Sequence, residues 1–305
     1  MYRFESRPVR VVISAFGSHR DATYGELFLS RATAPAGVLS DRIRRIVIEQ
    51  SKRANVGHIG SSLSVADILG TLYAGVLQGG GPSDPERDRF VLSKGHASLA
   101  LYAALHETGV IDGEELASFC VDGSRLGTHP DHVLPGVDFS TGSLGHGLSL
   151  ATGSALAARL SGSPRRTFAL MSDAECNEGS VWEAVMFAAH HELASLVLIV
   201  DVNGQQALGY THEVLDLSPL DEKWRAFGWD VHTVDGHDCD AMRAVLDGLA
   251  PTGAPHVLLA RTVFGRGVSY MEREIAWHYL PMDDRQYAAA LSELAVAESR
   301  REVAA

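Results

Sequence analysis

A carboxylate and an amide, Asp173 and Asn203, occupy positions from which they could hold one divalent cation together. Asp173 lies in the segment Ser172–Gly179 (SDAECNEG), and Asn203 closes the tripeptide Asp-Val-Asn thirty residues after Asp173. Mg²⁺ prefers oxygen ligands and is usually shared between protein carboxylates and a bound phosphate group. An aspartate at a strand-to-helix junction is also a common helix N-cap. The second segment favours a split site for magnesium and a diphosphate.

Both segments follow short apolar runs that are typical of buried strands. Residues 167–171 (TFALM) precede the first segment, and residues 196–200 (LVLIV) precede the second. Residues 182–193 carry apolar side chains at helical spacing. If both runs belong to one parallel sheet, Asp173 and Asn203 lie at the carboxyl ends of two strands. Ligands bind at that edge in open α/β sheets.

Three histidines lie beside glycine or proline in predicted turns. His58 follows a predicted helix, His96 lies between a strand at 88–93 and a helix at 97–107, and His129 lies in the loop GTHPDH. Imidazole has an ordinary pKa of about 6.5, which lets it donate or accept a proton near neutral pH. A lone histidine beside glycine is more often a loop or cap residue, so only the surrounding motifs make these histidines candidates.

Strand-like and helix-like segments alternate along the chain, which predicts an α/β fold: a doubly wound parallel sheet with helices on both faces. Further helices are expected at 39–53, 148–160, 241–249 and 284–302, and further strands at 229–234 and 256–260. Ser40 is expected to cap the first helix, Asp238 is expected to cap the helix near 241, and one helix is expected from 64 to 76. We predict an N-terminal extension at 1–37, expected to be a flexible arm, one binding domain at 38–282, and a C-terminal helix at 283–305.

The composition excludes several classes of protein. The formal net charge of −12 is unfavourable for nucleic acid binding, which needs clustered Lys and Arg. No apolar run approaches the length of about 20 residues that a membrane span needs. The three cysteines form no C-x-x-C pair, which favours a reducing compartment. We therefore expect a cytoplasmic protein that binds neither nucleic acid nor membrane.

From about residue 39 to residue 279, the sequence resembles the N-terminal half of transketolase. The resemblance rests on five motifs in family order: SKGH at His96, GTHPD at His129, STGSLG at residues 140–145, the segment around Asp173 with its later Asp-x-Asn-x-Gln, and the stretch from Gly267 to His278. The family usually begins the metal motif with Gly-Asp-Gly, whereas this chain has Ser172 and Ala174. A turn with positive φ at either position would be strained by the added Cβ atom.

The resemblance implies thiamine diphosphate and Mg²⁺ as cofactors, with Ca²⁺ or Mn²⁺ as substitutes for Mg²⁺. It assigns the metal to Asp173, Asn203 and the main-chain carbonyl of Gln205. Four histidines are implied as catalytic residues: His96 and His278 at the diphosphate, and His58 and His129 facing the substrate. The implied cofactor-binding residues are His96, Gly142, Leu144, Ser172, Asp173, Ala174, Glu178, Asn203 and His278.

The resemblance also implies a partner. In the family, a second half carries the pyrimidine domain and a catalytic glutamate, and the expected partner is a separate C-terminal transketolase subunit of that kind. Glu178 is expected at the contact between the subunits. Two-fold self-association would give a heterotetramer, and the complex would transfer a two-carbon ketol unit from a ketose donor to an aldose acceptor.

Two other functions stay open on the sequence. The chain could be half of a deoxyxylulose-phosphate synthase or of a ketoacid decarboxylase, although the loop at His129 and the Trp182-Glu183-Ala184 string favour transketolase. It could also be a non-catalytic homologue, which the replacements at Ser172 and Ala174 suggest. Neither the sugar nor its phosphorylation is readable from these residues, so the substrate is expected only to be a sugar or a sugar phosphate.

Overall fold

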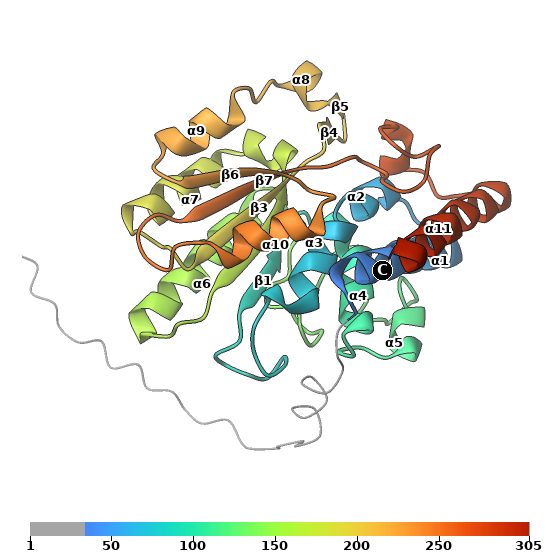
Figure 1. Ribbon diagram of the computed structural model, residues 1–305, viewed down its shortest axis with the longest axis horizontal. Coiled ribbons are helices and arrows are strands. Elements are labelled where there is room, and N and C mark those ends of the chain that lie inside the picture. Colours follow the sequence, from blue (N-terminus) through green and yellow to red (C-terminus); the bar gives the residue numbers. More distant parts are fainter. Residues whose placement is uncertain (1–33, 305) are drawn as a thin grey trace, which may run out of the picture.

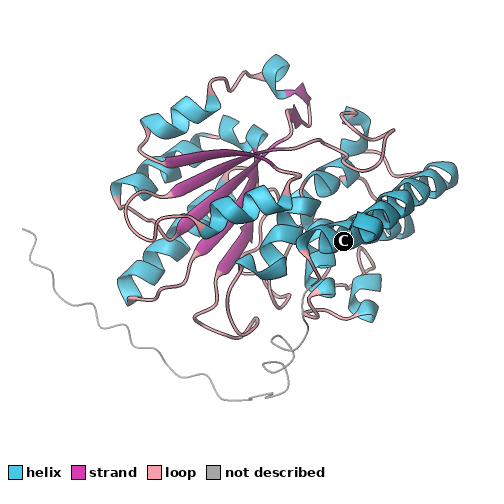
Figure 2. Ribbon diagram, viewed as in Figure 1, coloured by secondary structure: helices cyan, strands magenta, loops and turns pink. Residues whose placement is uncertain are grey.

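A five-stranded parallel sheet forms the centre of the protein in the computed structural model, which describes residues 34–304 (Figures 1 and 2). The strand order is β1-β2-β3-β7-β6. The strands are β1 (Arg89–Leu92), β2 (Thr167–Ser172), β3 (Leu196–Val202), β7 (His256–Arg261) and β6 (Asp230–Asp235). A two-stranded ribbon of β4 (Gln205–Gln206) and β5 (Gly209–Tyr210) follows β3. The predicted parallel sheet is confirmed.

Both faces of the sheet are buried, which explains why its strands read as continuous apolar runs. Side chains alternate between two cores along each strand. In β3, Val197 and Ile199 enter one core, whereas Leu196, Leu198 and Val200 enter the other.

The first core lies beneath α1 (Ala36–Ala54), α2 (Ile59–Ser64), α3 (Ala66–Thr71), α4 (Ser98–Glu107), α10 (Cys239–Asp247) and α11 (Asp284–Ala304). The second core lies beneath α6 (His146–Ser161), α7 (Gly179–His190) and α9 (Leu220–Ala226). Two shorter helices, α5 (Gly113–Ala117) and α8 (Thr211–Val214), lie in the connections. Helices on both faces of the sheet therefore agree with the predicted doubly wound arrangement.

Two local predictions were wrong. Helix α1 begins at Ala36, so Ser40 lies inside it and donates its hydroxyl to the Ala36 carbonyl instead of capping the helix. The single helix expected at 64–76 is divided into α3 and a π-helical turn, η1 (Leu72–Val76), and Ser64 belongs to α2. Gly75 has a φ of 123° within that turn, a backbone angle that no regular helix contains. By contrast, Asp238 caps α10 as predicted, because its side chain accepts a hydrogen bond from the Ala241 amide.

The two ends of the described chain pack together. Helix α11 lies along α1 (Figure 1), with Ala290 and Leu294 buried in the first core. The predicted extension at residues 1–37 falls almost entirely outside the described residues, and the domain limits stay a prediction. None of the helices within residues 34–304 combines the length and apolar character needed to cross a bilayer.

Candidate active site

The turn after β2 presents Asp173 at the carboxyl edge of the sheet. It forms the 3₁₀ helix η3 (Asp173–Asn177), and its N-cap is Ser172, not Asp173. Ser172 and Glu175 form a reciprocal capping box, in which the Glu175 amide donates to Ser172 Oγ and the Ser172 amide donates to Glu175 Oε2. Ser172 has a φ of −86°, and Ala174 is not among the residues of positive φ. Serine and alanine at the positions of the two family glycines therefore impose no backbone strain here.

Within residues 34–304, Asp173 is a buried carboxylate that is bonded only by main-chain amides. Its Oδ1 accepts from the Ala174 amide and its Oδ2 accepts from the Gly204 amide, both at 2.9 Å. Burial, together with the nearby charge of Asp201, raises the pKa of Asp173 to about 7. Such a carboxyl is costly to ionise unless a cation lies next to it.

The turn after β3 brings Asn203 to the same place. The amide of Gly204 binds Asp173, and the next amide, from Gln205, donates to Asn203 Oδ1 at 2.9 Å. The Asp173 and Asn203 side chains thus accept hydrogen bonds from two successive amides of the same turn. The residues predicted as metal ligands, Asp173, Asn203 and Gln205, are brought together by the neighbouring strands β2 and β3.

A fully buried ion pair supports this turn. Lys94 and Asp201 have side chains that are 0% exposed, and Lys94 Nζ lies 2.5 Å from Asp201 Oδ2. The same oxygen accepts hydrogen bonds from Ser64 Oγ and from Asn203 Nδ2, both at 2.8 Å. Because Asp201 holds the amide nitrogen of Asn203, the amide oxygen points to the other side, where a cation could bind.

Glu175 joins three separate segments beneath the site. Its buried carboxylate accepts from Ser93 Oγ at 2.5 Å, from the Gly145 amide at 3.0 Å and from the Ser172 amide at 2.9 Å. These donors follow β1, precede α6 and end β2. Glu175 therefore fixes the loop of residues 140–145 against the metal turn.

Four histidines from distant parts of the sequence gather at the same edge. The ring centroids of His58, His96 and His278 lie 5.3 to 5.5 Å from one another, and His129 lies 6.5 Å from His58. Ser61 Oγ bonds His96 Nε2 at 2.8 Å, and Lys94 Nζ donates to the Ser61 carbonyl at 3.4 Å. The buried ion pair thus connects this histidine cluster, defined as His58, His96, His129 and His278, to the metal turn.

The backbone at His58 is held in an unusual conformation. His58 has a φ of 60°, in the left-handed region that residues with a side chain rarely adopt. Its amide donates to the His278 carbonyl at 3.2 Å. A Cβ atom at the neighbouring Gly57 would lie only 2.3 Å from the Tyr279 carbonyl oxygen, so glycine is required for this approach. Contacts with the loop at residues 278–279 therefore support the strained conformation.

Burial keeps the histidine cluster uncharged at neutral pH. It lowers the pKa of His58, His129 and His96, and the pKa of His96 is also lowered by the charge of Lys94. The pKa of His278 falls to about 4 through burial and through His58 and Lys94. The Nδ1 atoms of His58 and His278 are buried and have no hydrogen-bond partner among the residues that the structure describes. These histidines therefore retain free hydrogen-bonding capacity for a ligand.

The remaining predicted residues form the rim of the site. An added Cβ at Gly142, whose φ is 155°, would lie 2.9 Å from His129 Cδ2. Leu144 is 40% exposed, and Glu178 is exposed beside Gly145. An open depression of about 710 Å³ is lined by His129, the loop of residues 140–143, His146, Ser149 and Leu150. This rim is open enough for another molecule to cover it.

The donor set fits a diphosphate and a hard cation. Asp173, Asn203 and the Gln205 carbonyl supply oxygen atoms, and the buried Asp173 carboxylate lacks a cationic side chain bonded to it among the described residues. The unpartnered ring nitrogens of His58 and His278 lie in the adjoining cluster. These are the groups that Mg²⁺ and an anionic ligand would satisfy.

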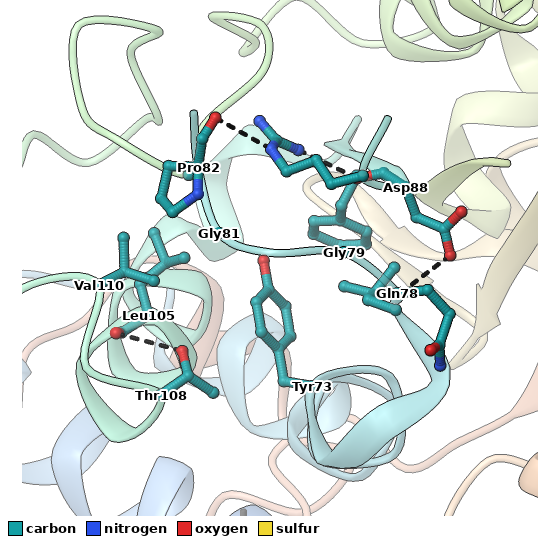
Figure 3. A pocket seen from close by; sticks show the side chains of 13 residues that line it. Tyr73, Gln78, Gly79, Gly81, Pro82, Asp88, Leu105, Thr108 and Val110 are labelled. Atoms are coloured by element: carbon teal, nitrogen blue, oxygen red, sulfur yellow. Dashed lines mark hydrogen bonds between the residues drawn. The ribbon is translucent and has the colours of Figure 1, made fainter. Parts of the chain in front are cut away.

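A smaller cavity, of about 90 Å³, lies away from this edge (Figure 3). Its lining is mostly apolar, and the Tyr73 hydroxyl points into it from η1. Asp88 and Arg87 border it but are engaged in ion pairs with Arg166 and Asp138. The cavity contains none of the residues predicted to do chemistry.

Comparison with known proteins decides the family. Residues 37–302 match the family described as "Transketolase, thiamine diphosphate binding domain". The chain belongs to the transketolase family. It is 40% identical over 256 residues to 6-deoxy-6-sulfo-D-fructose transketolase subunit SqwG of Clostridium sp. (strain MSTE9), covering 83% of this chain and 93% of that protein. It is 41% identical over 255 residues to an apulose-4-phosphate transketolase subunit of Actinobacillus succinogenes, covering 82% of this chain and 92% of that protein.

Solved transketolases share the fold of this transketolase family member. The structure from Campylobacter jejuni superimposes with a TM-score of 0.78 at 27% identity, over 86% of this chain and 43% of that one. The chain therefore spans less than half of that transketolase. The predicted thiamine diphosphate-binding fold and the predicted class, a transketolase-like transferase subunit that binds thiamine diphosphate, are confirmed.

The residue roles stay predictions, but the structure brings together the residues to which they were assigned. Sequence reasoning missed Lys94, Asp201 and Glu175 as supports of the site. One signal was available, because Asp201 is the single charged residue in the strand LVLIVDV. A charge at that position needs a buried partner.

Proposed function

We propose that this chain is the diphosphate-binding subunit of a two-component transketolase and transfers a two-carbon ketol unit from a ketose to an aldose. The observation that carries the proposal is the convergence of Asp173 and Asn203 on one turn beside the histidine cluster. The names of two relatives, each a transketolase subunit, support a two-component arrangement.

Asp173, Asn203 and the Gln205 carbonyl would hold Mg²⁺, or Ca²⁺ or Mn²⁺ in its place. His278 and His96, which are neutral at pH 7, would donate N–H groups to the diphosphate without adding charge. Lys94 and Asp201 would hold Asn203 and Ser61 in place for these contacts. When bound, thiamine diphosphate supplies the nucleophilic carbon and the electron sink of the reaction.

His58 and His129 would transfer protons to and from the sugar. Cleavage of the donor between C2 and C3 requires removal of the proton on the C3 hydroxyl, and formation of the new bond requires a proton for the acceptor's carbonyl oxygen. A neutral imidazole can accept the first proton and return the second. The lowered pKa of each ring keeps it in the neutral form that accepts a proton at pH 7.

The partner would be a subunit that carries the pyrimidine domain and a catalytic glutamate. The exposed Leu144 and Glu178 and the open depression beside His129 lie where such a subunit would complete the site. Two copies of each chain would give a heterotetramer related by a two-fold axis. The substrate would be a sugar or a sugar phosphate, since the relatives' names include a sulfonated fructose and a phosphorylated apulose.

The proposal is tested by purifying a tagged form of the chain from its host and identifying the proteins that accompany it. A stoichiometric partner of transketolase type, with Mg²⁺-dependent binding of thiamine diphosphate by the complex, is the expected result. Ketol transfer is then assayed with a panel of ketoses and aldoses. A purified complex that binds no thiamine diphosphate would overturn the proposal.

A further inference from the structure

The opposite edge of the sheet carries a second group of metal-binding side chains. Asp230 and His232 are two residues apart on β6 and therefore lie on the same face of the sheet. Asp230 is the register partner of His256 on β7. The three residues lie at the amino ends of these strands. The active-site edge lies at the carboxyl ends, about 17 Å away along a six-residue strand.

The three side chains converge on a single carboxylate oxygen. His232 Nε2 and His256 Nδ1 each lie 3.0 Å from Asp230 Oδ2. One ligand atom from each residue lies within 4.8 Å of the other two. Only this group of three or more His, Cys, Asp or Glu side chains meets that criterion within the described residues.

The tautomer of His256 is fixed by a carbonyl group. Its Nε2 lies 2.8 Å from the Ala250 carbonyl oxygen, which can only accept, so Nε2 carries the hydrogen. In the neutral ring, Nδ1 then holds a lone pair and faces Asp230 Oδ2, which also carries lone pairs. A neutral histidine has no hydrogen for that contact. Either the ring is an imidazolium, or one cation binds both atoms.

The surroundings of His256 match those of a metal ligand. Histidines that bind metals usually donate the second ring N–H to a carbonyl or carboxylate, which orients the ring. The Ala250 carbonyl does this from the loop between α10 and β7. The His256 side chain is 2% exposed, whereas His232 and Asp230 are 32% and 44% exposed. The group is therefore anchored on one side and open to solvent on the other.

We propose that Asp230, His232 and His256 form a zinc site that is separate from the catalytic edge. Two imidazoles and one carboxylate are a common ligand set for Zn²⁺, whereas Mg²⁺ prefers oxygen atoms alone. The exposed side leaves room for water as the fourth ligand. The ion would join the outermost strand β6 to β7 and, through Ala250, to the loop that covers His256.

Zinc affinity of the full chain is measured by competition with a chromophoric chelator in the presence of millimolar Mg²⁺. The expected result is about one equivalent of Zn²⁺ bound, with affinity reduced at least about 10-fold in His232→Asn and in Asp230→Asn. His212→Asn is the matched control, because His212 is exposed and lies outside the group. Its affinity is expected to equal that of the unaltered protein.

Cobalt absorption adds a readout of coordination, since Co²⁺ in a four-coordinate site absorbs far more strongly than hydrated Co²⁺. The strong bands are expected in the unaltered protein and in His212→Asn, and they are expected to be lost in His232→Asn. Equal zinc affinity in all variants, or zinc binding that is lost in His96→Asn rather than His232→Asn, would overturn the proposal. The first result would leave a charged His-Asp-His network, and the second would place the ion in the histidine cluster.

Discussion

The two edges of the central sheet use histidine in opposite ways. At the carboxyl edge, loops carry the histidine cluster, and two buried ring nitrogens, Nδ1 of His58 and of His278, have no hydrogen-bond partner in the described part of the chain. At the amino edge, strands carry His232 and His256, and both nitrogens of His256 face a neighbouring oxygen atom. Burial alone does not distinguish them, because His278 and His256 are both buried.

The difference shows what prepares a site for a large ligand. Residues in strands have their side chains fixed by register, so neighbours can satisfy each polar atom. Loops that are supported by close backbone contacts, such as the one at Gly57, can leave polar atoms unpaired. Unpaired buried groups destabilise the unliganded protein and are satisfied when the ligand binds.

The largest expected loss of stability follows from breaking the Lys94–Asp201 ion pair beneath the carboxyl edge. Lys94→Met leaves the Asp201 carboxylate buried without its counter-charge, which should lower the free energy of unfolding by about 3–5 kcal/mol. Urea denaturation at pH 7 measures this loss. Lys52→Met serves as the control, because the Lys52 side chain is partly exposed. A loss below about 1 kcal/mol would show that the pair does not support the edge.

A histidine with two partners at the carboxyl edge sharpens the comparison. His237 Nδ1 lies 2.8 Å from Asp67, and Nε2 accepts from the Val263 amide. Although burial opposes ionisation, Arg44 and His237 hold the pKa of Asp67 far below its usual range. Asp67→Asn should cost about 3 kcal/mol at pH 7, because Arg44 loses the nearer of its two buried counter-charges.

The effect of Asp67→Asn should depend on pH. A carboxyl group whose pKa is lower in the folded than in the unfolded protein stabilises the fold at any pH above its unfolded pKa. That contribution is lost as the pH falls through the folded pKa. The stability difference between the two proteins should therefore be constant from pH 5 to 7 and should narrow from about pH 4 toward pH 2. Denaturation at several pH values measures it, and a difference that stays constant throughout would contradict the assignment.

Replacement of the proposed metal ligand should abolish binding without unfolding the protein. Asp173→Asn removes the charge that would balance Mg²⁺, so the affinity of the complex for thiamine diphosphate should fall at least about 100-fold. Calorimetry with and without Mg²⁺ measures the change. Asp122→Asn is the control, since Asp122 is exposed. Unchanged affinity in Asp173→Asn would place the metal elsewhere.

His278→Asn should lower the affinity of the complex for thiamine diphosphate by less than Asp173→Asn does. One hydrogen bond to a charged group contributes about 1.5–3 kcal/mol, so affinity should fall roughly 10-fold or more. The ratio of the two affinities should not change with pH near neutrality, because the His278 ring, with a pKa of about 4, is already neutral there. A variant with full affinity would remove His278 from the diphosphate site.

The smallest effect is expected at the amino edge when no zinc is present. His232→Asn should change the free energy of unfolding by less than about 0.5 kcal/mol, because the side chain is partly exposed. His256→Asn should cost about 1–3 kcal/mol, because a buried ring is replaced and the Ala250 carbonyl loses its partner. Chelator-treated protein is compared by thermal and urea denaturation. Equal losses of unfolding free energy in His232→Asn and His256→Asn would contradict the difference in burial between the two side chains.

The sequence was sufficient to predict the parallel sheet and to bring Asp173 and Asn203 to one edge of it. Apolar runs marked β2 and β3, and their ends placed Asp173 and Asn203 at one edge. The supports of the site could not be predicted in the same way. Lys94 and Asp201 meet only because β3 and the turn after β1 are folded against each other, and no local pattern records a pairing 107 residues apart.

The amino-edge group was missed for a related reason. Asp230 and His232 are two residues apart, but His256 joins them only through the register of β6 with β7. A one-residue shift in that register would turn His256 to the other face of the sheet. The helix expected at 64–76 was wrong for a different, local reason, because Gly75 was not recognised as an interruption.

The strand order has a consequence for synthesis on the ribosome. Strand β3 ends at Val202, but its second neighbour, β7, begins only at His256. At 5–20 residues per second, translation of the roughly fifty intervening residues takes about 3–10 s. For that time one edge of the most apolar strand of the sheet lacks its hydrogen-bonding neighbour, and such edges promote aggregation. The yield of soluble protein should therefore depend on codon usage between Val202 and His256.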